Sequence, residues 1–209
     1  MEDEYEKFVI ETIQGYQDEI KQYSLDINNG DKSAEKYMLL FSSYNSLYEF
    51  TQKDKKHQCI TKDTVDRICE TLLSKIRQEM TQGLNLATNY CFLGYIATYK
   101  KENTKALEYY DKAVEIDEKT LLNRAQFKNH YLNDRQGALD DYNRALANES
   151  NPNERKIIQH LIKNIDLIRE SDALVKSIHW QSSFADGVGA DFRLTAEARR
   201  ESCRKSAVQ

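Results

Sequence analysis

Helix-breaking residues are scarce in this chain of 209 residues, which contains one proline and seven glycines. An α-helix keeps its ladder of backbone hydrogen bonds only where proline is absent and glycine is rare. Apolar residues also recur at three- and four-residue steps through most of the sequence, as on the buried stripe of a helix. The sequence therefore predicts an all-α fold.

Residues 1–83 are predicted to form an N-terminal helical region of three amphipathic helices. Gly30 and Gly83 are expected to end the first and the third helix, because glycine tolerates the left-handed backbone found there. Asp31 or Ser33 is expected to cap the second helix. The region shows only this pattern, so whether its last two helices are a divergent repeat is left open.

The strongest signal is an internal repeat at an offset of 32 residues. Residues 106–113 read Ala-Leu-Glu-Tyr-Tyr-Asp-Lys-Ala, and residues 138–145 read Ala-Leu-Asp-Asp-Tyr-Asn-Arg-Ala. Two antiparallel helices approach closely only where side chains are small, so the repeated alanines are predicted to lie at helix crossings. Tyr110 and Tyr142 are predicted to fill the space between successive hairpins. The hairpins would use helices at 86–101, 104–117, 119–132 and 135–148.

This pattern resembles the tetratricopeptide repeat family, in which a bulky residue, Leu-Gly and an Ala-aromatic-Ala series recur over about 34 residues. The first hairpin matches through Tyr90, Leu93-Gly94, Ala106, Tyr110 and Ala113, and the second through Asn123-Arg124-Ala125, Ala138, Tyr142 and Ala145. The sequence departs from the family at Ala97, at Glu118, and at Phe127 and Tyr131, which lie off the expected register. A generic helical bundle is the alternative interpretation.

The resemblance implies an α–α superhelix of helix–turn–helix repeats with helices flanking them on both sides. Such repeats need layers that cover their ends. Pro152, after Asn151 as N-cap, is expected to begin a capping helix. The predicted organisation is an N-terminal region at 1–83, repeats at 84–150, the capping helix at 151–181, and a flexible or partly helical tail at 182–209.

In the family, the first helix of each hairpin lines a concave groove that holds a peptide or a partner helix. The resemblance therefore implies a mixed polar and aromatic groove, with Tyr95 and Tyr99 as its anchors. A chaperone-tail carboxylate clamp is not expected, because the matching positions lack its cations. The chain's own tail, with Trp180 and Phe184, is a competing occupant. The predicted groove residues are Thr88, Cys91, Tyr95, Thr98, Tyr99, Leu122, Gln126, Asn129 and His130.

Charge and motif content disfavour the other function classes. The formal net charge of −4 provides no basic footprint for nucleic acid, although Arg199, Arg200, Arg204 and Lys205 form a small basic tail. No phosphate-binding glycine loop or nucleophile motif is present, so no enzyme activity, cofactor or metal is predicted. His57, Cys59 and Cys69 fit no metal-ligand spacing. Carboxylate pairs such as Asp140 and Asp141 are expected to be solvated.

The sequence thus predicts a non-enzymatic interaction module or adaptor that binds a protein or peptide. An alternative is a regulatory subunit of a nucleic-acid-associated complex that uses the basic tail, and a third is an enzyme with an unrecognised site. Scattered cysteines, an acidic N-terminus and the lack of a long apolar run predict a cytoplasmic protein without membrane contact. The partner and the oligomeric state are not specified by these features.

Overall fold

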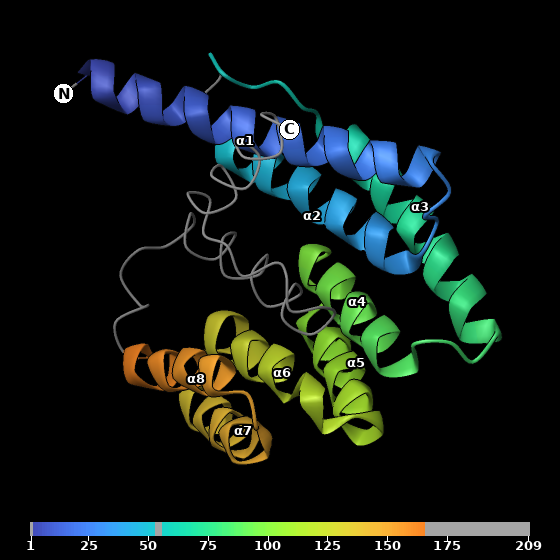
Figure 1. Cartoon of the computed structure of the whole chain (residues 1–209), viewed down its shortest axis with the longest axis vertical. Helices are drawn as coiled ribbons and strands as arrows, with labels where there is room; N and C mark the ends of the chain where they lie inside the picture. The colour runs from blue at the N-terminus through green and yellow to red at the C-terminus, as the bar shows by residue number, and fades with distance from the viewer. Residues whose placement is uncertain (1, 53–55, 166–209) are drawn as a thin grey trace. The chain divides into compact units, whose positions relative to one another are not determined.

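The computed structural model describes residues 2–52 and 56–165, and all regular elements in this part of the chain are helices (Figure 1). The predicted all-α fold is confirmed. The chain divides after Lys75 into two compact units. The division falls inside helix α3 (Lys62–Thr81), where neither glycine nor proline marks a boundary in the sequence.

In the first unit, α1 (Glu2–Asn28) packs along α2 (Ala34–Thr51). Tyr23, Ile27 and Leu40 form their shared core, and Ile68 of α3 packs against it. Gly30 ends α1 with φ +115°, and Ser33 caps α2 by accepting the N–H of Lys36 at 3.2 Å. The C-terminal part of the apolar stripe of α1 is therefore buried along α2, whereas Tyr5 near its start is exposed.

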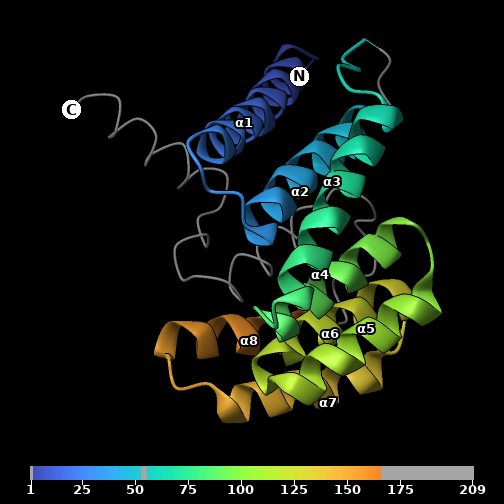
Figure 2. The same cartoon turned by 90° about the vertical axis from the view of Figure 1, so that its right-hand side faces the viewer.

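The second unit contains two helical hairpins followed by one more helix (Figure 2). α4 packs against α5 in the first hairpin, α6 packs against α7 in the second, and α8 packs against α7. A 3₁₀ turn at Glu118–Thr120 precedes α6, and a π-helical turn at Lys128–Leu132 follows it. The helices are α4 (Leu86–Tyr99), α5 (Asn103–Ile116), α6 (Leu121–Phe127), α7 (Arg135–Asn148) and α8 (Pro152–Asn164).

The backbone of the two hairpins repeats at the same offset as the sequence. Lys101 and Asn133 both adopt the left-handed conformation, with φ +62° and +55°, at the turn between the paired helices. An acidic residue follows each of them and precedes the second helix, at Glu102 and Asp134. A lysine at a left-handed position is uncommon. The left-handed turn at Lys101 could therefore not be predicted from its residue type.

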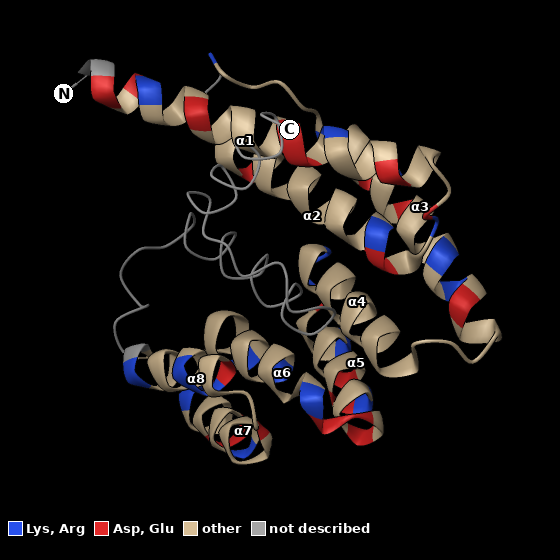
Figure 3. Ribbon diagram, in the orientation of Figure 1, with Lys and Arg blue, Asp and Glu red and all other residues tan. Residues whose placement is uncertain are grey.

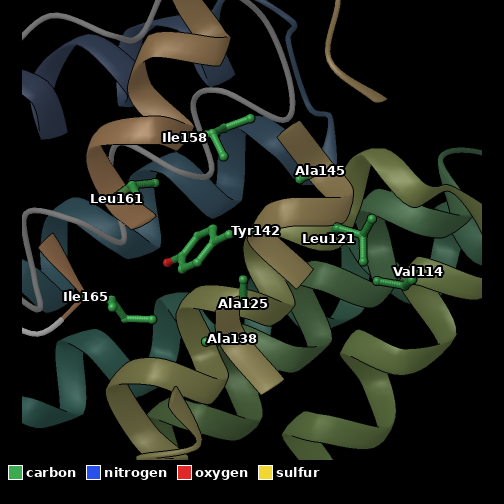
Figure 4. Close-up of a cluster of buried hydrophobic side chains, with 9 residues drawn as sticks. All are labelled: Val114, Leu121, Ala125, Ala138, Tyr142, Ala145, Ile158, Leu161 and Ile165. Carbon is green, nitrogen blue, oxygen red and sulfur yellow. The ribbon is translucent and has the colours of Figure 1, made fainter. Parts of the chain in front are cut away.

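Tyr110 and Tyr142 each connect one hairpin to the next layer. The Tyr110 ring lies 5.1 Å from that of Phe127 in α6, centroid to centroid. Tyr142 belongs to a buried cluster that joins Ala125 of α6 to Ile158 and Leu161 of α8 (Figure 4). Tyr110 thus lies between two hairpins as predicted, whereas Tyr142 lies between the second hairpin and the single helix α8.

The first helix of the second hairpin is irregular, as Phe127 and Tyr131 indicated. The α-helical part ends at Phe127, and the π-helical turn that follows inserts an extra residue into the helix. Phe127 is fully buried, and its ring stacks on that of Tyr131 at 5.7 Å. The irregular end of this helix therefore carries a stacked pair of aromatic rings.

The final described helix begins as the sequence predicts. The side chain of Asn151 accepts the N–H of Asn153 at 2.9 Å, and Pro152 occupies the first turn. α8 shares a core with α6 and α7. The predicted continuation to residue 181 and the tail at 182–209 lie outside the described residues. Within the described chain, no helix combines the length and the apolar character needed to cross a membrane.

Replacing Ala106 or Ala138 by leucine is expected to destabilise the second unit by about 1–3 kcal/mol through overpacking. Both alanines are fully buried, so a larger side chain has no space to enter. Urea unfolding followed by circular dichroism measures the effect. Ala147→Leu is the matched control, because Ala147 lies exposed on α7. Equal stability of all three variants would show that the alanines do not mark helix crossings.

Candidate functional site

The nine residues predicted to line a groove are positioned by α4, by α6 and by the π turn after α6. We call them the α4–α6 face: Thr88, Cys91, Tyr95, Thr98, Tyr99, Leu122, Gln126, Asn129 and His130. Four of them are buried, namely Cys91, Tyr95, Thr98 and Gln126, and the other five are partly buried. The face therefore offers a partner less surface than the sequence predicts.

Packing between the helices explains the buried members of this face. The Cys91 Sγ accepts a hydrogen bond from the Asn123 Nδ2 at 3.3 Å, which places Cys91 in the seam between α4 and α6. Thr98 donates its hydroxyl to the Gly94 carbonyl at 2.9 Å within α4. Tyr95 is only 6% exposed, so Tyr99 is the predicted anchor that remains partly accessible.

Leu122 also packs against the interior of the second unit. Its side chain packs against the cluster around Tyr142, which α6 shares with α7 and α8. This packing does not follow from the pattern of residues, because the side of α6 on which α8 packs depends on the path of the chain after Pro152. Leu122 is therefore partly buried by this packing, and only part of its side chain is open to a partner.

The titratable groups in the interior of the first hairpin are held in their neutral forms. Burial raises the pKa of the Cys91 thiol to about 12, although a hydrogen bond with Asn123 partly opposes this. Burial also raises the pKa of Tyr110 well above its usual value, with a hydrogen bond to Thr98 acting in the opposite direction. A thiol that stays protonated is a poor nucleophile. Cys91 is thus a packing residue and not a reactive one.

Two buried side-chain oxygens near this face receive no hydrogen bond. They are the Oδ1 of Asn123 and the Oε1 of Gln126, on residues that are 6% and 4% exposed. A buried acceptor without a donor costs about 1–3 kcal/mol. Sequence reasoning singled out Gln126 but used Asn123 only as part of the repeat motif. The two residues lie three apart on α6, on adjoining sides of the helix.

A cluster of four charged side chains ties α5, α6 and α7 together. Arg124 donates to both carboxylate oxygens of Asp141, at 2.7 and 2.8 Å, and to Asp111 at 2.8 Å. The Lys128 Nζ lies 2.8 Å from the same Asp141 carboxylate. The prediction that Asp141 is solvated is wrong, because its side chain is only 3% exposed, whereas Asp140 is exposed as expected.

The electrostatics of this cluster favour its charged form. Burial alone would raise the pKa of Asp141, but hydrogen bonds from Arg124 and Lys128 outweigh burial and hold the pKa below its usual range. The hydrogen bond to Asp141 raises the pKa of Arg124. Each charge in the cluster has an opposite charge beside it, so we interpret the cluster as a structural connection between hairpins.

The histidine and cysteines considered as possible metal ligands, His57, Cys59 and Cys69, have different surroundings. The His57 Nε2 lies 3.1 Å from the Glu6 carboxylate, Cys59 is exposed and Cys69 is buried. Among the residues that the structure describes, no three potential ligands gather as a metal site would require. The basic residues at 199–205 lie outside those residues.

Comparison with family models, with curated proteins and with solved structures finds no match to this chain.

Proposed function

We propose that the chain is a non-enzymatic protein-binding module built on tetratricopeptide-like hairpins, and that its α4–α6 face binds an extended peptide segment. The role is that of an adaptor or scaffold, and the proposed location is the cytoplasm. Within the described residues, Cys59, Cys69 and Cys91 form no disulfide, as is usual for a reducing compartment.

The repeated hairpins support the link to the tetratricopeptide family. Equivalent positions of the two hairpins are buried: Ala106, Tyr110 and Ala113 in the first, and Ala138, Tyr142 and Ala145 in the second. The left-handed turn residues recur at the same offset. Stacked helical hairpins of this kind commonly present surfaces for partner proteins.

The observation that carries the proposal is the pair of buried oxygens on Asn123 and Gln126 that receive no hydrogen bond. Side chains three residues apart on a helix are about 5–6 Å apart. Alternate N–H groups of an extended chain are spaced by about 6.7 Å on one side. Both oxygens are buried in the unbound chain, so an extended peptide can offer one backbone donor to each only where the side chains that cover them move aside, and binding would then supply the missing hydrogen bonds.

The uncharged character of the face indicates which part of a partner it would hold. Its nine members include no lysine, arginine or carboxylate. A free C-terminal carboxylate requires cations or several N–H donors, which acceptor oxygens cannot replace. An internal segment with free backbone N–H groups is the ligand that this chemistry fits.

Gln126→Met is expected to weaken peptide binding about tenfold while raising the free energy of unfolding by about 1 kcal/mol. Methionine preserves the volume of glutamine but removes the acceptor that has no donor in the unbound protein. The probe is a decapeptide selected against the full chain from a random library. Its affinity is measured by fluorescence anisotropy, and stability is measured by urea unfolding.

Gln136→Met is the matched control, because Gln136 is exposed on α7 and its substitution should change neither quantity. Analogues of the decapeptide that are N-methylated at single positions should lose affinity at two alternate positions. Unchanged binding by Gln126→Met, or by every N-methylated analogue, would contradict the assignment of the oxygens. Failure to select any peptide would contradict the binding function itself.

A further inference from the structure

The described part of the chain ends beside the α4–α6 face. Ile165, the last described residue, is buried in a cluster that also contains Ala125 of α6, and Leu122 of the face packs against the same cluster. Ala125 directly precedes Gln126, whose Oε1 receives no hydrogen bond. Residues 166–209 therefore start from a point close to the acceptor oxygens of the face.

The lack of charge on this face restricts what can occupy it. The helix α4 supplies five of the nine members, has no charged residue in its 14 positions and is mostly tan in Figure 3. Arg124 of α6 and Lys128 of the π turn both pair with Asp141, so their charges are already neutralised within the ion cluster. A charged group buried without a partner is costly. The face therefore favours an occupant of low charge.

One stretch of the chain after Ile165 has this character. Residues 173–184 read Ala-Leu-Val-Lys-Ser-Ile-His-Trp-Gln-Ser-Ser-Phe, with one charged residue and no proline, so each of them has a backbone N–H to donate. Ile178, Trp180 and Phe184 differ in number by two and by four, so an extended chain would place them on one side. Residues 193–205, by contrast, contain five bases and two acids and do not fit an uncharged face.

We propose that residues 173–184 of this chain occupy the α4–α6 face when no partner is bound, and that a partner peptide binds by displacing them. The proposal rests on the assignment of the acceptor oxygens in the proposed function. Residues 166–172 span at most about 25 Å when extended, and they start from the cluster that α6 lines, so the segment can reach the face. The proposal requires the predicted capping helix to end before Ala173 rather than at residue 181.

Attachment to the same chain makes weak binding sufficient. A short flexible linker gives the attached segment an effective concentration on the order of 1 mM at its own site. A segment whose dissociation constant as a separate peptide is about 0.1 mM would then fill the face about ten times as often as it leaves it empty. The apparent affinity for an external peptide falls by about the same factor. The segment thus sets a threshold that a partner peptide has to exceed.

The fluorescence of Trp180 tests the position of the segment directly, because Trp180 is the only tryptophan in the chain. In the full chain its emission should be blue-shifted and protected from quenching by acrylamide. Saturation with the selected decapeptide, chosen without tryptophan, should shift the emission to the red and remove the protection. Gln126→Met should do so in part without any peptide, because it removes one acceptor, whereas the control Gln136→Met should leave the emission unchanged.

Trp180→Ser should raise the affinity of the full chain for the labelled decapeptide about tenfold in fluorescence anisotropy, because it empties the face. Phe192→Ser is the matched control, an aromatic-to-serine change outside the segment that should leave the affinity unchanged.

Two results would overturn the proposal while the proposed function stands: decapeptide binding that leaves the emission of Trp180 unmoved, and equal affinities of Trp180→Ser and Phe192→Ser. Failure to select any decapeptide would contradict the proposed function instead. The free chain then decides on the segment, because exposure of Trp180 by Gln126→Met supports its docking on the face and an unchanged emission overturns it.

Discussion

Gly94→Ala is expected to lower the free energy of unfolding by about 3 kcal/mol, although alanine is the better helix former. A Cβ atom at this position would lie 2.7–2.9 Å from three ring atoms of Tyr110. The ring cannot retreat easily, because Tyr110 is 1% exposed and packs against Phe127. Urea unfolding monitored by circular dichroism measures the loss.

Gly15→Ala is the matched control for this substitution. Gly15 also lies within a helix, α1, but a Cβ atom there would meet no atom within 4 Å. The same chemical change should therefore stabilise the protein by about 0.5–1 kcal/mol. Trimming the ring in Gly94→Ala/Tyr110→Leu should make the two substitutions non-additive. Equal effects of alanine at the two glycines would show that α4 and α5 do not approach closely at Gly94.

The packing of the hairpins was accessible to sequence reasoning because it depends on residue size at fixed spacing. Ala106, Ala138, Tyr110 and Tyr142 occupy the buried positions that the repeat predicts. Small and aromatic side chains at a constant offset constrain how two helices meet, because few arrangements of the helices allow both a close approach at the small residues and burial of the rings. The second hairpin shows the limit, because Phe127 indicated an irregular helix but not that the irregularity is a π turn.

The composition of the candidate site could be predicted only in part, because burial depends on which helix covers each side of α6. Cys91 and Leu122 lie on the expected helices, yet Cys91 is in the seam with Asn123 and Leu122 packs against the core that α6 shares with α8. Neither contact follows from periodicity within a single helix. The partial exposure of Tyr99 and the burial of Tyr95 likewise depend on packing between helices.

The buried ion cluster was missed for a similar reason. Asp140 and Asp141 are adjacent and chemically identical, and either one could have faced solvent. What separates them is Arg124, which lies 17 positions before Asp141 and reaches it only after α6 and α7 have paired. The repeat did not indicate that Asp141 is buried, because the equivalent residue of the first hairpin is Tyr109.

Asp141→Asn is expected to lower the free energy of unfolding by about 3–5 kcal/mol at neutral pH. The substitution preserves shape but removes the negative charge between Arg124 and Lys128, whose side chains are 14% and 16% exposed. Arg124 would keep its ion pair with Asp111, whereas Lys128 would lose the carboxylate that lies 2.8 Å from its Nζ. Asp140→Asn, at the exposed neighbour, should change stability by less than about 0.5 kcal/mol. A small loss in both variants would contradict the structural role of the cluster.

The pH dependence of this loss identifies its electrostatic origin. The pKa of Asp141 in the folded protein is held below its value in the unfolded chain, about 3.9, so the unfolded state binds the proton first. The stabilisation from the charged carboxylate is therefore complete above about pH 5 and is lost as the pH falls through the folded-state pKa. Asp141→Asn has no such proton to bind, so its curve should approach that of the wild type in acid. Urea unfolding from about pH 7 to about pH 3 tests this. A difference between the two proteins that stays constant over this range would mean that the substitution acts through packing and not through charge.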